Sequence, residues 1–278
     1  MPGSDLNPRA EHPASPGQLL SPLLAGAGFR HAFFTRQGGA SQGPFESLSF
    51  STAVGDDPQH VEENLRRAGA ALGVAPDHIL YLSQVHGRVA RFYTTSRPRS
   101  EVITLEGDAI GGSAFDCAYG VRSADCVPVL LADEPSGAVM AVHAGWRGVA
   151  AGAVGAGVER LRQNLPREGR LLAAIGPHIS NAAFEVSAEV AAELLAACPG
   201  DSTSALLRPP GREKPYIDLR FIVTQQLLAL GLEASAIDHV GGCTLLEPER
   251  YFSFRRDGKQ SGRHLSAIVP RRGHLGAP

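Results

Sequence analysis

The sequence predicts a mixed α/β (α+β) protein, on three observations. Strand-like and helix-like segments alternate irregularly along the chain. The 278 residues are 43% hydrophobic and 19% charged, which is typical of a globular protein with a substantial core. This length suits one large domain or two small ones, but no long linker divides it, and the loop-like stretch 208–215 is short.

The predicted elements follow from local patterns. The pair Asp57-Pro58 begins a helix, with Asp57 as its cap and Val61, Leu65 and Leu72 on its apolar face. Further helices are predicted at 148–165, 188–197 and 218–230, and the small residues of the first should let it pack close to a sheet. Strands are predicted at 29–35, 78–83, 89–93, 127–132, 137–142, 171–175, 237–240 and 251–254. The polar ends, 1–18 and 271–278, are predicted to be tails.

Composition excludes several classes of protein. The formal net charge is −2 and no basic run carries interleaved aromatic residues, so we expect no nucleic-acid partner. No apolar stretch has the length of a membrane span, and residues 1–18 lack the apolar core of a signal peptide. We therefore expect a cytoplasmic protein without a membrane partner. Its four cysteines should be free thiols or metal ligands rather than disulfides.

One predicted hairpin brings two reactive side chains together. Two apolar runs at 127–132 and 137–142 flank the turn-forming sequence Asp133-Glu134-Pro135-Ser136. If Asp133 faces Ser136, the same antiparallel register places Cys126 opposite His143. A thiol and an imidazole then emerge side by side at the open end of the hairpin.

Each of these residues has an ordinary structural explanation. A lone buried cysteine is usually an inert core thiol, and a lone histidine usually packs or lies on the surface. The two residues lie together at the open end of the hairpin, beside Asp125, Trp146 and Arg147. In that setting a reactive or metal-binding site is about as plausible as the ordinary structural explanation. No local argument attaches a third ligand to the pair.

Several motifs are similar to those of a known family. They are Phe34-Thr35-Arg36-Gln37-Gly38-Gly39, Gln84-Val85-His86-Gly87, Gly107-Asp108-Ala109, Ala124-Asp125-Cys126-Val127-Pro128, His143-Ala144-Gly145-Trp146-Arg147-Gly148 and Phe252-Ser253-Phe254-Arg255-Arg256-Asp257-Gly258. In this order, over residues 28–270, they resemble the YfiH/laccase-domain family. Members of that family have been called polyphenol oxidases and purine nucleoside phosphorylases.

The resemblance implies a fold and a metal site. The fold is a single-domain layered α/β sandwich with mixed β-sheets, which would occupy residues 19–270. The metal ligands are the histidine of the second motif, the cysteine of the fourth and the histidine of the fifth. These are His86, Cys126 and His143, all present here. We expect zinc, with copper as the alternative metal.

The sequence departs from the family pattern after Ile175-Gly176-Pro177. Family members commonly carry cysteines before an aromatic residue and Glu-Val, whereas this chain has none between 178 and 186. Those cysteines cannot be essential ligands here. His178 lies in this stretch, and we expect it to be a packing or hydrogen-bonding residue rather than a ligand.

Two nitrogens and one thiolate leave a fourth zinc position open, which is the pattern of catalytic rather than structural zinc. Asp108 and Asp125 are the carboxylates expected to orient ligands or move protons, although Asp125 could equally cap a turn. The candidates for holding an anion such as phosphate are three arginines, each of which could instead be structural: Arg36, Arg147 and Arg255.

Three functions compete at this point. The resemblance implies phosphorolysis of a purine nucleoside such as inosine or adenosine, with adenosine deamination and methylthioadenosine phosphorolysis as further activities. Alternatively, Cys126 as nucleophile and His143 as base, or the metal itself, would hydrolyse an amide of a peptidoglycan precursor. Copper-dependent phenol oxidation is the least favoured, since the chain has ten histidines but no His-x-His pair. The partners expected are small molecules, and both a monomer and a homodimer remain open.

Overall fold

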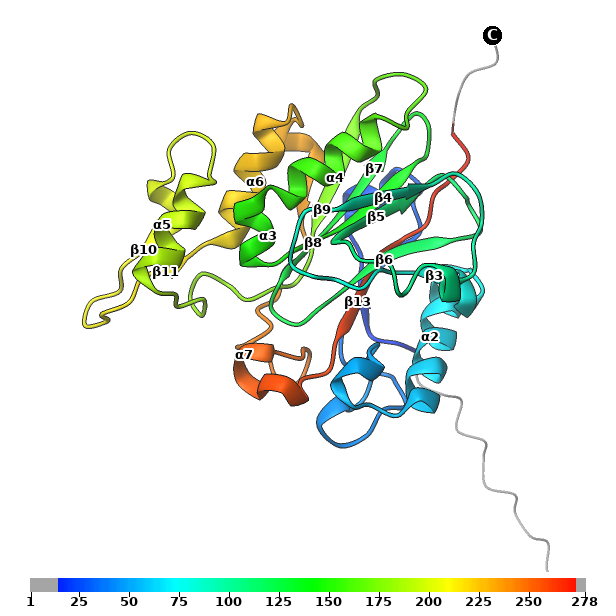
Figure 1. Cartoon of the computed structure of the whole chain (residues 1–278), viewed down its shortest axis with the longest axis horizontal. Helices are drawn as coiled ribbons and strands as arrows, with labels where there is room; N and C mark the ends of the chain where they lie inside the picture. Colours follow the sequence, from blue (N-terminus) through cyan, green and yellow to red (C-terminus); the bar gives the residue numbers. More distant parts are fainter. Residues whose placement is uncertain (1–14, 274–278) are drawn as a thin grey trace, which may run out of the picture.

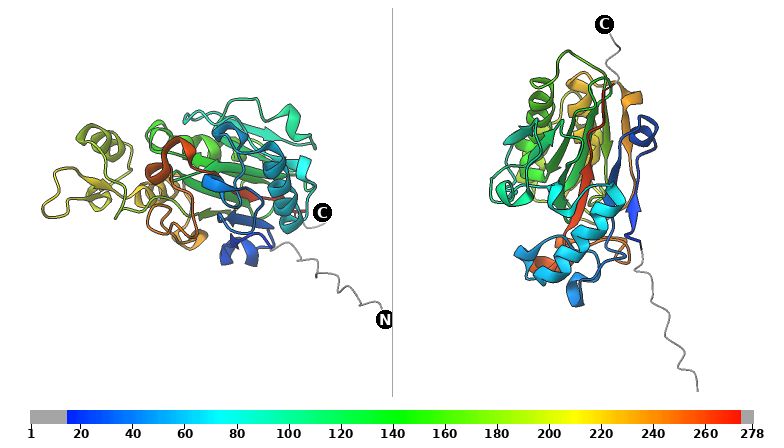
Figure 2. Two further views of the ribbon diagram at one scale, coloured as in Figure 1. Left: turned by 90° about the horizontal axis from the view of Figure 1, so that it is seen from below. Right: turned by 90° about the vertical axis from the view of Figure 1, so that its right-hand side faces the viewer.

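The computed structural model describes residues 15–273 and contains two mixed β-sheets packed face to face (Figure 1). Helices cover the outer face of each sheet, so the layers run helix, sheet, sheet, helix. The right-hand view of Figure 2 shows helices α3 and α4 on one side of the central strands and the strands of the second sheet on the other. The predicted mixed α/β class and layered sandwich are confirmed.

The six-stranded sheet has the order β12-β9-β7-β8-β5-β4. Its strands are β4 (Ala90–Tyr93), β5 (Ala109–Gly112), β7 (Val127–Asp133), β8 (Val139–Ala144), β9 (Leu171–Ile175) and β12 (Ile237–His239). The helices on its outer side are α3 (Trp146–Ala151), α4 (Ala153–Arg162), α5 (Ala188–Ala196) and α6 (Leu219–Ala229).

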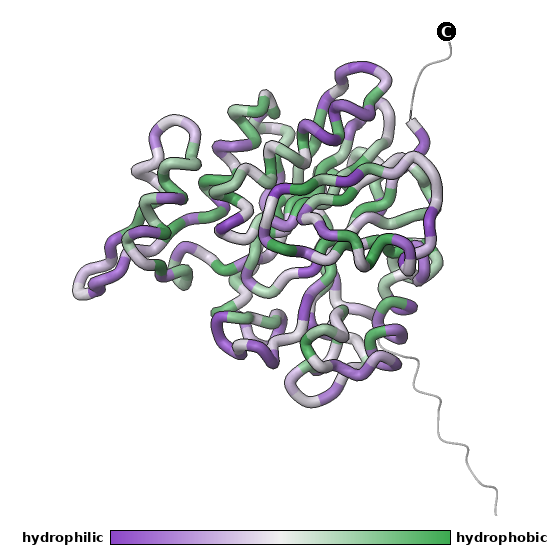
Figure 3. Tube along the Cα trace, in the orientation of Figure 1, coloured by the Kyte–Doolittle hydropathy of each residue, from purple (hydrophilic) through white to green (hydrophobic). Residues whose placement is uncertain are grey.

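The central strand β7 is apolar on both faces because both faces are covered. Val129 and Leu131 join the core under the helices, while Leu130 and Ala132 join the core between the two sheets. This alternation is the ordinary two-residue period of a strand, with an apolar partner on either side. Figure 3 shows the resulting concentration of hydrophobic residues in the middle of the molecule. Within the described part of the chain, no helix has the length and apolar character to cross a membrane.

The five-stranded sheet has the order β1-β2-β13-β6-β3. Its strands are β1 (Gln18–Leu19), β2 (His31–Phe34), β3 (Ile79–Leu80), β6 (Ala118–Ser123) and β13 (His264–Ile268). Helix α2 (Pro58–Leu72) covers the outer face, where Val61 and Leu65 pack with Leu265 and Ala267 of β13. The remaining α-helices and strands are α1 (Pro22–Gly26), α7 (Phe254–Asp257), and β10 (Leu206–Leu207) with β11 (Tyr216–Ile217), which pair as a separate two-stranded antiparallel sheet.

Several element predictions are confirmed. Asp57 caps α2 and its side chain accepts from the backbone N–H of Gln59, as expected of the Asp57-Pro58 start. The predicted loop 208–215 lies between β10 and β11. All four cysteines are free. The helix predicted at 148–165 is instead two helices, because Gly152 adopts a left-handed φ of 83° that ends α3 and begins α4.

The prediction of a strand at 251–254 is wrong. Ser253 caps α7, and its hydroxyl accepts from the backbone N–H of Arg256 at 3.2 Å. Capping therefore overrides the β-propensity of the aromatic residues here. Tyr251 and Phe252 are nevertheless fully buried, in a segment without regular structure.

The hairpin of β7 and β8 forms, but its predicted register is wrong by two residues. His143 faces Pro128, and Ala144 faces Val127, so Cys126 lies just before β7 rather than opposite His143. The turn is longer than expected because Gly137, with a φ of 77°, belongs to it, and Asp133 accepts from the backbone N–H of Ser136. A two-residue shift keeps every side chain on its predicted face.

The predicted tails lie mostly outside the described residues, since 1–14 and 274–278 are not described. Inside that range, Gln18 already belongs to β1 and pairs with Phe34. Arg271 also makes defined contacts: its backbone N–H donates to Gly137, and its guanidinium lies 4.7 Å from the ring centre of Phe29. Gln18 and Arg271 therefore take part in the fold, on either side of the expected range 19–270.

Helix α4 packs so closely on β8 that Gly157 has no room for a side chain. An added Cβ would lie 2.5 Å from Cγ2 of Val142. Gly157→Ala should therefore lower the free energy of unfolding by about 1–3 kcal/mol, although alanine favours helices. Gly155→Ala is the matched control in the same helix: its Cβ meets no atom within 4 Å, so it should gain about 0.5–1 kcal/mol. Urea unfolding measures both, and equal effects would contradict the close packing.

Candidate metal centre

Three predicted ligands meet where the chain crosses from one sheet to the other. His86 lies in the loop after β3, Cys126 lies between β6 and β7, and His143 lies on β8. Their ligand atoms are all within 4.8 Å of one another, and Sγ of Cys126 is 3.9 Å from Nε2 of His86. The two imidazole rings meet edge to face with centres 4.9 Å apart. The cluster therefore offers two nitrogens and a sulfur to one ion.

Asp108 fixes the geometry of both histidines. Its carboxylate is buried, and one oxygen lies 2.8 Å from Nδ1 of His143. The same carboxylate accepts from the backbone N–H of His86 at 2.9 Å and of Gly87 at 2.7 Å. Because Nδ1 of His143 is occupied in this way, Nε2 is the nitrogen left for a metal.

Two residues of the site have backbone conformations that residues other than glycine rarely adopt. His86 has a φ of 59° and Asp125 a φ of 83°, both in the left-handed region that favours glycine. The Asp125 carboxylate accepts from the Thr244 hydroxyl and from the backbone N–H of Arg255, each at 2.6 Å. Such backbones persist only where their surroundings hold them, and they concentrate at functional sites. Asp125 thus acts here as an anchor between loops.

The space below the cluster excludes any side chain. A Cβ on Gly145 would lie 2.9 Å from both Sγ of Cys126 and Cδ2 of His86. Gly145 of the motif His143–Gly148 is therefore required for a steric reason: the backbone passes so close to the ligand atoms that no side chain fits there.

The charges of the site favour a thiolate. Burial alone would raise the pKa of the Cys126 thiol, but His143 and His86 outweigh it and lower the pKa to about 6. Burial would likewise lower the pKa of His143, yet Cys126 and Asp108 raise it to about 9. A deprotonated sulfur is the form that ligates metal ions and attacks electrophiles.

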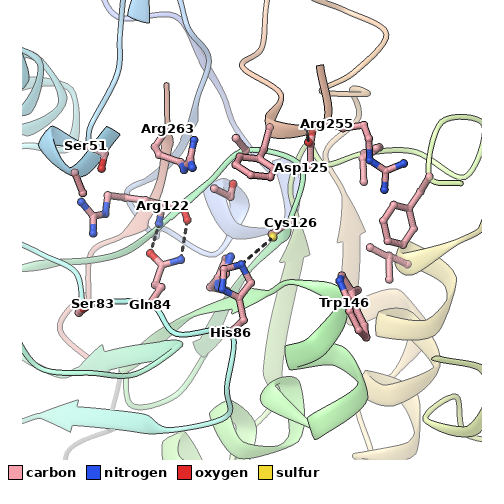
Figure 4. Close-up of a pocket in the computed structure, with 18 residues that line it drawn as sticks. Ser51, Ser83, Gln84, His86, Arg122, Asp125, Cys126, Trp146, Arg255 and Arg263 are labelled. Carbon is pink, nitrogen blue, oxygen red and sulfur yellow. Dashed lines mark hydrogen bonds between the residues drawn. The ribbon is translucent and has the colours of Figure 1, made fainter. Parts of the chain in front are cut away.

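The cluster lies at the wall of a cavity of about 540 Å³ (Figure 4). This volume is in the usual range for small-molecule sites. Apolar, neutral polar and charged side chains surround the ligands. The large apolar ones are Trp146, Ile179, Phe184, Leu219 and Phe254, and the neutral polar ones are Ser51, Ser83, Gln84 and Ser123. The charged ones besides the ligands are Arg122, Asp125, Arg255 and Arg263.

The three arginines expected to hold an anion lie in different places. Arg255 lines the cavity, and its guanidinium donates to the backbone carbonyl of Glu185. Arg36 is outside the lining: it donates to the backbone carbonyls of Glu46 and Pro248 and lies over Phe252. Arg147 is exposed, over the ring of Trp146, and is also outside the lining.

Arg122 and Arg263 line the cavity but were not among the predicted site residues. They lie on β6 and just before β13, two strands that the sequence did not predict. A signal was available for Arg122, because it lies in the largely apolar run 118–123, and an arginine is seldom placed in a buried strand unless it has a partner or a specific role.

His178 lies apart from the cluster, as expected. It is buried, and its Nδ1 lies 2.8 Å from the backbone carbonyl oxygen of Gly176. Among residues 15–273, a second group with metal-ligating side chains in reach of one another is His78, Asp116 and Cys117. These residues directly precede β3 and β6, whereas the cavity lining comes from the other end of these two parallel strands.

The fold and site together define a layered α/β protein with a three-ligand centre open to a cavity. The chain belongs to the YfiH/laccase-domain family: the family model described as a multi-copper polyphenol oxidoreductase laccase matches residues 30–271. This confirms the family resemblance found in the motifs.

Relatives share most of their length with this chain. A protein of Corynebacterium glutamicum named as a purine nucleoside phosphorylase is 33% identical over 86% of this chain and 93% of its own. The Escherichia coli protein named purine nucleoside phosphorylase YfiH is 36% identical over 84% and 90%. Among solved structures, YlmD of Geobacillus stearothermophilus is 30% identical with a TM-score of 0.81, covering 94% of this chain and 100% of that one.

The first prediction from this site concerns metal content. Freshly purified protein should carry about one zinc per chain, and Cys126→Ser and His86→Ala should each lose it, because each removes one of three ligands. His178→Ala is the control, a buried histidine outside the cluster, and should keep the metal. Elemental analysis with circular dichroism measures content and folding. Stoichiometric zinc in both ligand variants, or its loss from a folded His178→Ala protein, would show that the ligands are wrongly assigned.

The second prediction concerns pH in metal-free protein. The lowered pKa of Cys126 means that the thiolate is present above about pH 6 and is lost as the pH falls through that value. Alkylation of Cys126 by iodoacetamide, followed by peptide mass spectrometry, should therefore be half-maximal near pH 6. In His143→Gln the midpoint should move up toward the ordinary range of a thiol, roughly 8.5. An unchanged midpoint in that variant would remove His143 as the cause.

Proposed function

We propose that this protein is a zinc-dependent purine nucleoside phosphorylase that converts a purine nucleoside and phosphate to the free base and ribose 1-phosphate. The observation that carries the proposal is one cavity whose wall combines the three-ligand cluster, an apolar surface and arginines that form no salt bridge with a carboxylate of residues 15–273. The names of relatives at about one-third identity support the same activity.

The residues fit a zinc ion. The donor set of two imidazole nitrogens and one thiolate is one that zinc accepts, and Asp108 presets the orientation of His143. Gly145 leaves the space beneath these atoms free of side chains. His86, Cys126 and His143 would hold the ion, which would supply a Lewis acid at the wall of the cavity. Copper suits the same donors, so the proposal names zinc as the metal to test first.

The rest of the cavity suits a nucleoside and an anion. Trp146, Phe184 and Leu219 offer apolar surface on which a purine ring can pack. In phosphorolysis a phosphate oxygen bonds to C1′ of the ribose, and the bond from C1′ to the base breaks. The electron pair leaves with the base, which takes up a proton. The protein must therefore hold a dianion close to the sugar, and fixed arginines suit that role.

Asp108 and Asp125 position other groups in this proposal. Asp108 is fully engaged with His143 and the backbone of the His86 loop. Asp125 is engaged with Thr244 and Arg255. Asp108 acts through a candidate metal ligand, as outer partners of metal ligands commonly do, whereas Asp125 acts by holding the loops of Thr244 and Arg255 in place.

A cysteine amidase is the second candidate, because the low pKa of Cys126 would make it a nucleophile in the absence of metal. Zinc bound to the same sulfur would prevent that attack. Adenosine deamination, methylthioadenosine phosphorolysis and phenol oxidation have no separate support from the residues of the cavity.

The proposal is tested with zinc-loaded protein, inosine or adenosine, and phosphate, with products separated by chromatography. We expect the base and ribose 1-phosphate in equal amounts, no base without phosphate, and turnover reduced by at least about 100-fold in Cys126→Ser. The metal-retaining His178→Ala variant is the control and should keep its activity. If no base appears while a muramyl-amino-acid amide is hydrolysed by metal-free protein, the amidase replaces this proposal.

A further inference from the structure

Two arginines that the sequence did not single out lie together at one end of the cavity. Figure 4 shows Arg122 and Arg263 on one side of His86 and Cys126, with Arg255 and Trp146 on the other side. Both side chains belong to the cavity lining. Among the described residues, neither forms a salt bridge with a carboxylate, whereas many arginines of this chain do.

Arg122 is held rigidly but is short of hydrogen-bond partners. Its backbone N–H and carbonyl both pair with the side-chain amide of Gln84, at 2.8 and 2.7 Å, and its guanidinium lies 4.3 Å from the ring centre of Tyr81. The guanidinium reaches only two backbone carbonyls, at 3.4 and 3.5 Å, which is long for a hydrogen bond. Its Nε is buried and has no partner among the described residues. A buried donor without a partner is costly, so it indicates a missing acceptor.

Arg263 brings a second positive charge to the same place. Its Nη1 donates to the backbone carbonyls of Ser261 and Gly262, at 2.7 and 3.0 Å. Burial lowers the pKa of both arginines, and the charge of Arg263 lowers that of Arg122 further. Asp125 and Cys126 act on Arg263 in the opposite direction and favour its charge. No described carboxylate forms a salt bridge with either guanidinium, however, so the two like charges repel each other unless an anion binds between them.

We infer that Arg122 and Arg263 form a subsite for a phosphate dianion at this end of the cavity. Phosphate provides the acceptor that Arg122 lacks and a directly paired negative charge, which neither guanidinium has among the described residues. The hydroxyl of Ser51 and the amide of Gln84 line the same end and add neutral polar groups. The inference rests on the proposed function for the identity of its ligand, since inorganic phosphate is the second substrate of a phosphorylase.

The subsite is tested by binding rather than by turnover. Equilibrium dialysis of radiolabelled inorganic phosphate against zinc-loaded protein gives a dissociation constant for each variant. Arg122→Gln and Arg263→Gln should each weaken binding by about 10- to 100-fold, because each removes a charged donor. Arg97→Gln is the matched control: Arg97 also lies over a tyrosine, Tyr93, but outside the cavity lining, so binding should not change.

The outcomes separate this inference from the proposed function. Unchanged phosphate binding in a folded Arg122→Gln protein and in Arg263→Gln overturns the subsite, even if phosphorolysis proceeds. Loss of binding in both variants, with the control intact, supports it even if no nucleoside is cleaved. A parallel titration with a nucleoside 5′-monophosphate identifies the source of the anion: tighter binding than inorganic phosphate, lost in the same two variants, assigns the subsite to a nucleotide phosphoryl group. Should Arg122→Gln fail to fold, Arg263→Gln alone decides the result.

Discussion

Asp108 carries a buried carboxylate that accepts from the backbone of the His86 loop while it also holds Nδ1 of His143. Burying a carboxylate costs several kcal/mol unless hydrogen bonds and charge compensate for it. Here burial would raise the pKa of Asp108, but the hydrogen bond from His143 and those from the backbone more than offset it, so the pKa stays lowered. One side chain therefore sets the loop, the imidazole orientation and the charge balance of the centre.

The architecture explains why the centre lies where it does. Strand β6 belongs to the five-stranded sheet and β7 to the six-stranded sheet, so residues 124–126 connect the two layers. Cys126 lies in that connection, and His143 lies beside the start of β7 because of the antiparallel pairing. The stacked sheets supply rigid supports from two layers, which suits a site that must hold its ligands within a fraction of an ångström.

Part of this could be predicted from the sequence, and the reasons for the rest are physical. The hairpin was predictable because two apolar runs flank turn-forming residues. The longer turn shifted the register by two residues, so each side chain still lies on the predicted face of the sheet. The position of His86 beside Cys126 and His143 depends on the hydrogen bond to Asp108 and on a left-handed backbone conformation. No local sequence pattern encodes these features, so only the family motifs identified His86 as a ligand. Arg122 and Arg263 were missed because neither β6 nor β13 was predicted: Gly120 and Arg122 interrupt the apolar pattern of β6, and His264 and Ser266 that of β13, which begins directly after Arg263.

The order of the strands also affects how this protein is made. The last strand, β13, lies between β2 and β6 in the middle of its sheet, and Asp125 depends on Thr244 and Arg255, far downstream in the chain. While the chain is still emerging from the ribosome, β2 and β6 thus have an open edge and no partner between them. The backbone before Cys126 has no anchor at that stage. The three candidate ligands are therefore held in place only after β13 and the segment that carries Thr244 and Arg255 have joined the fold.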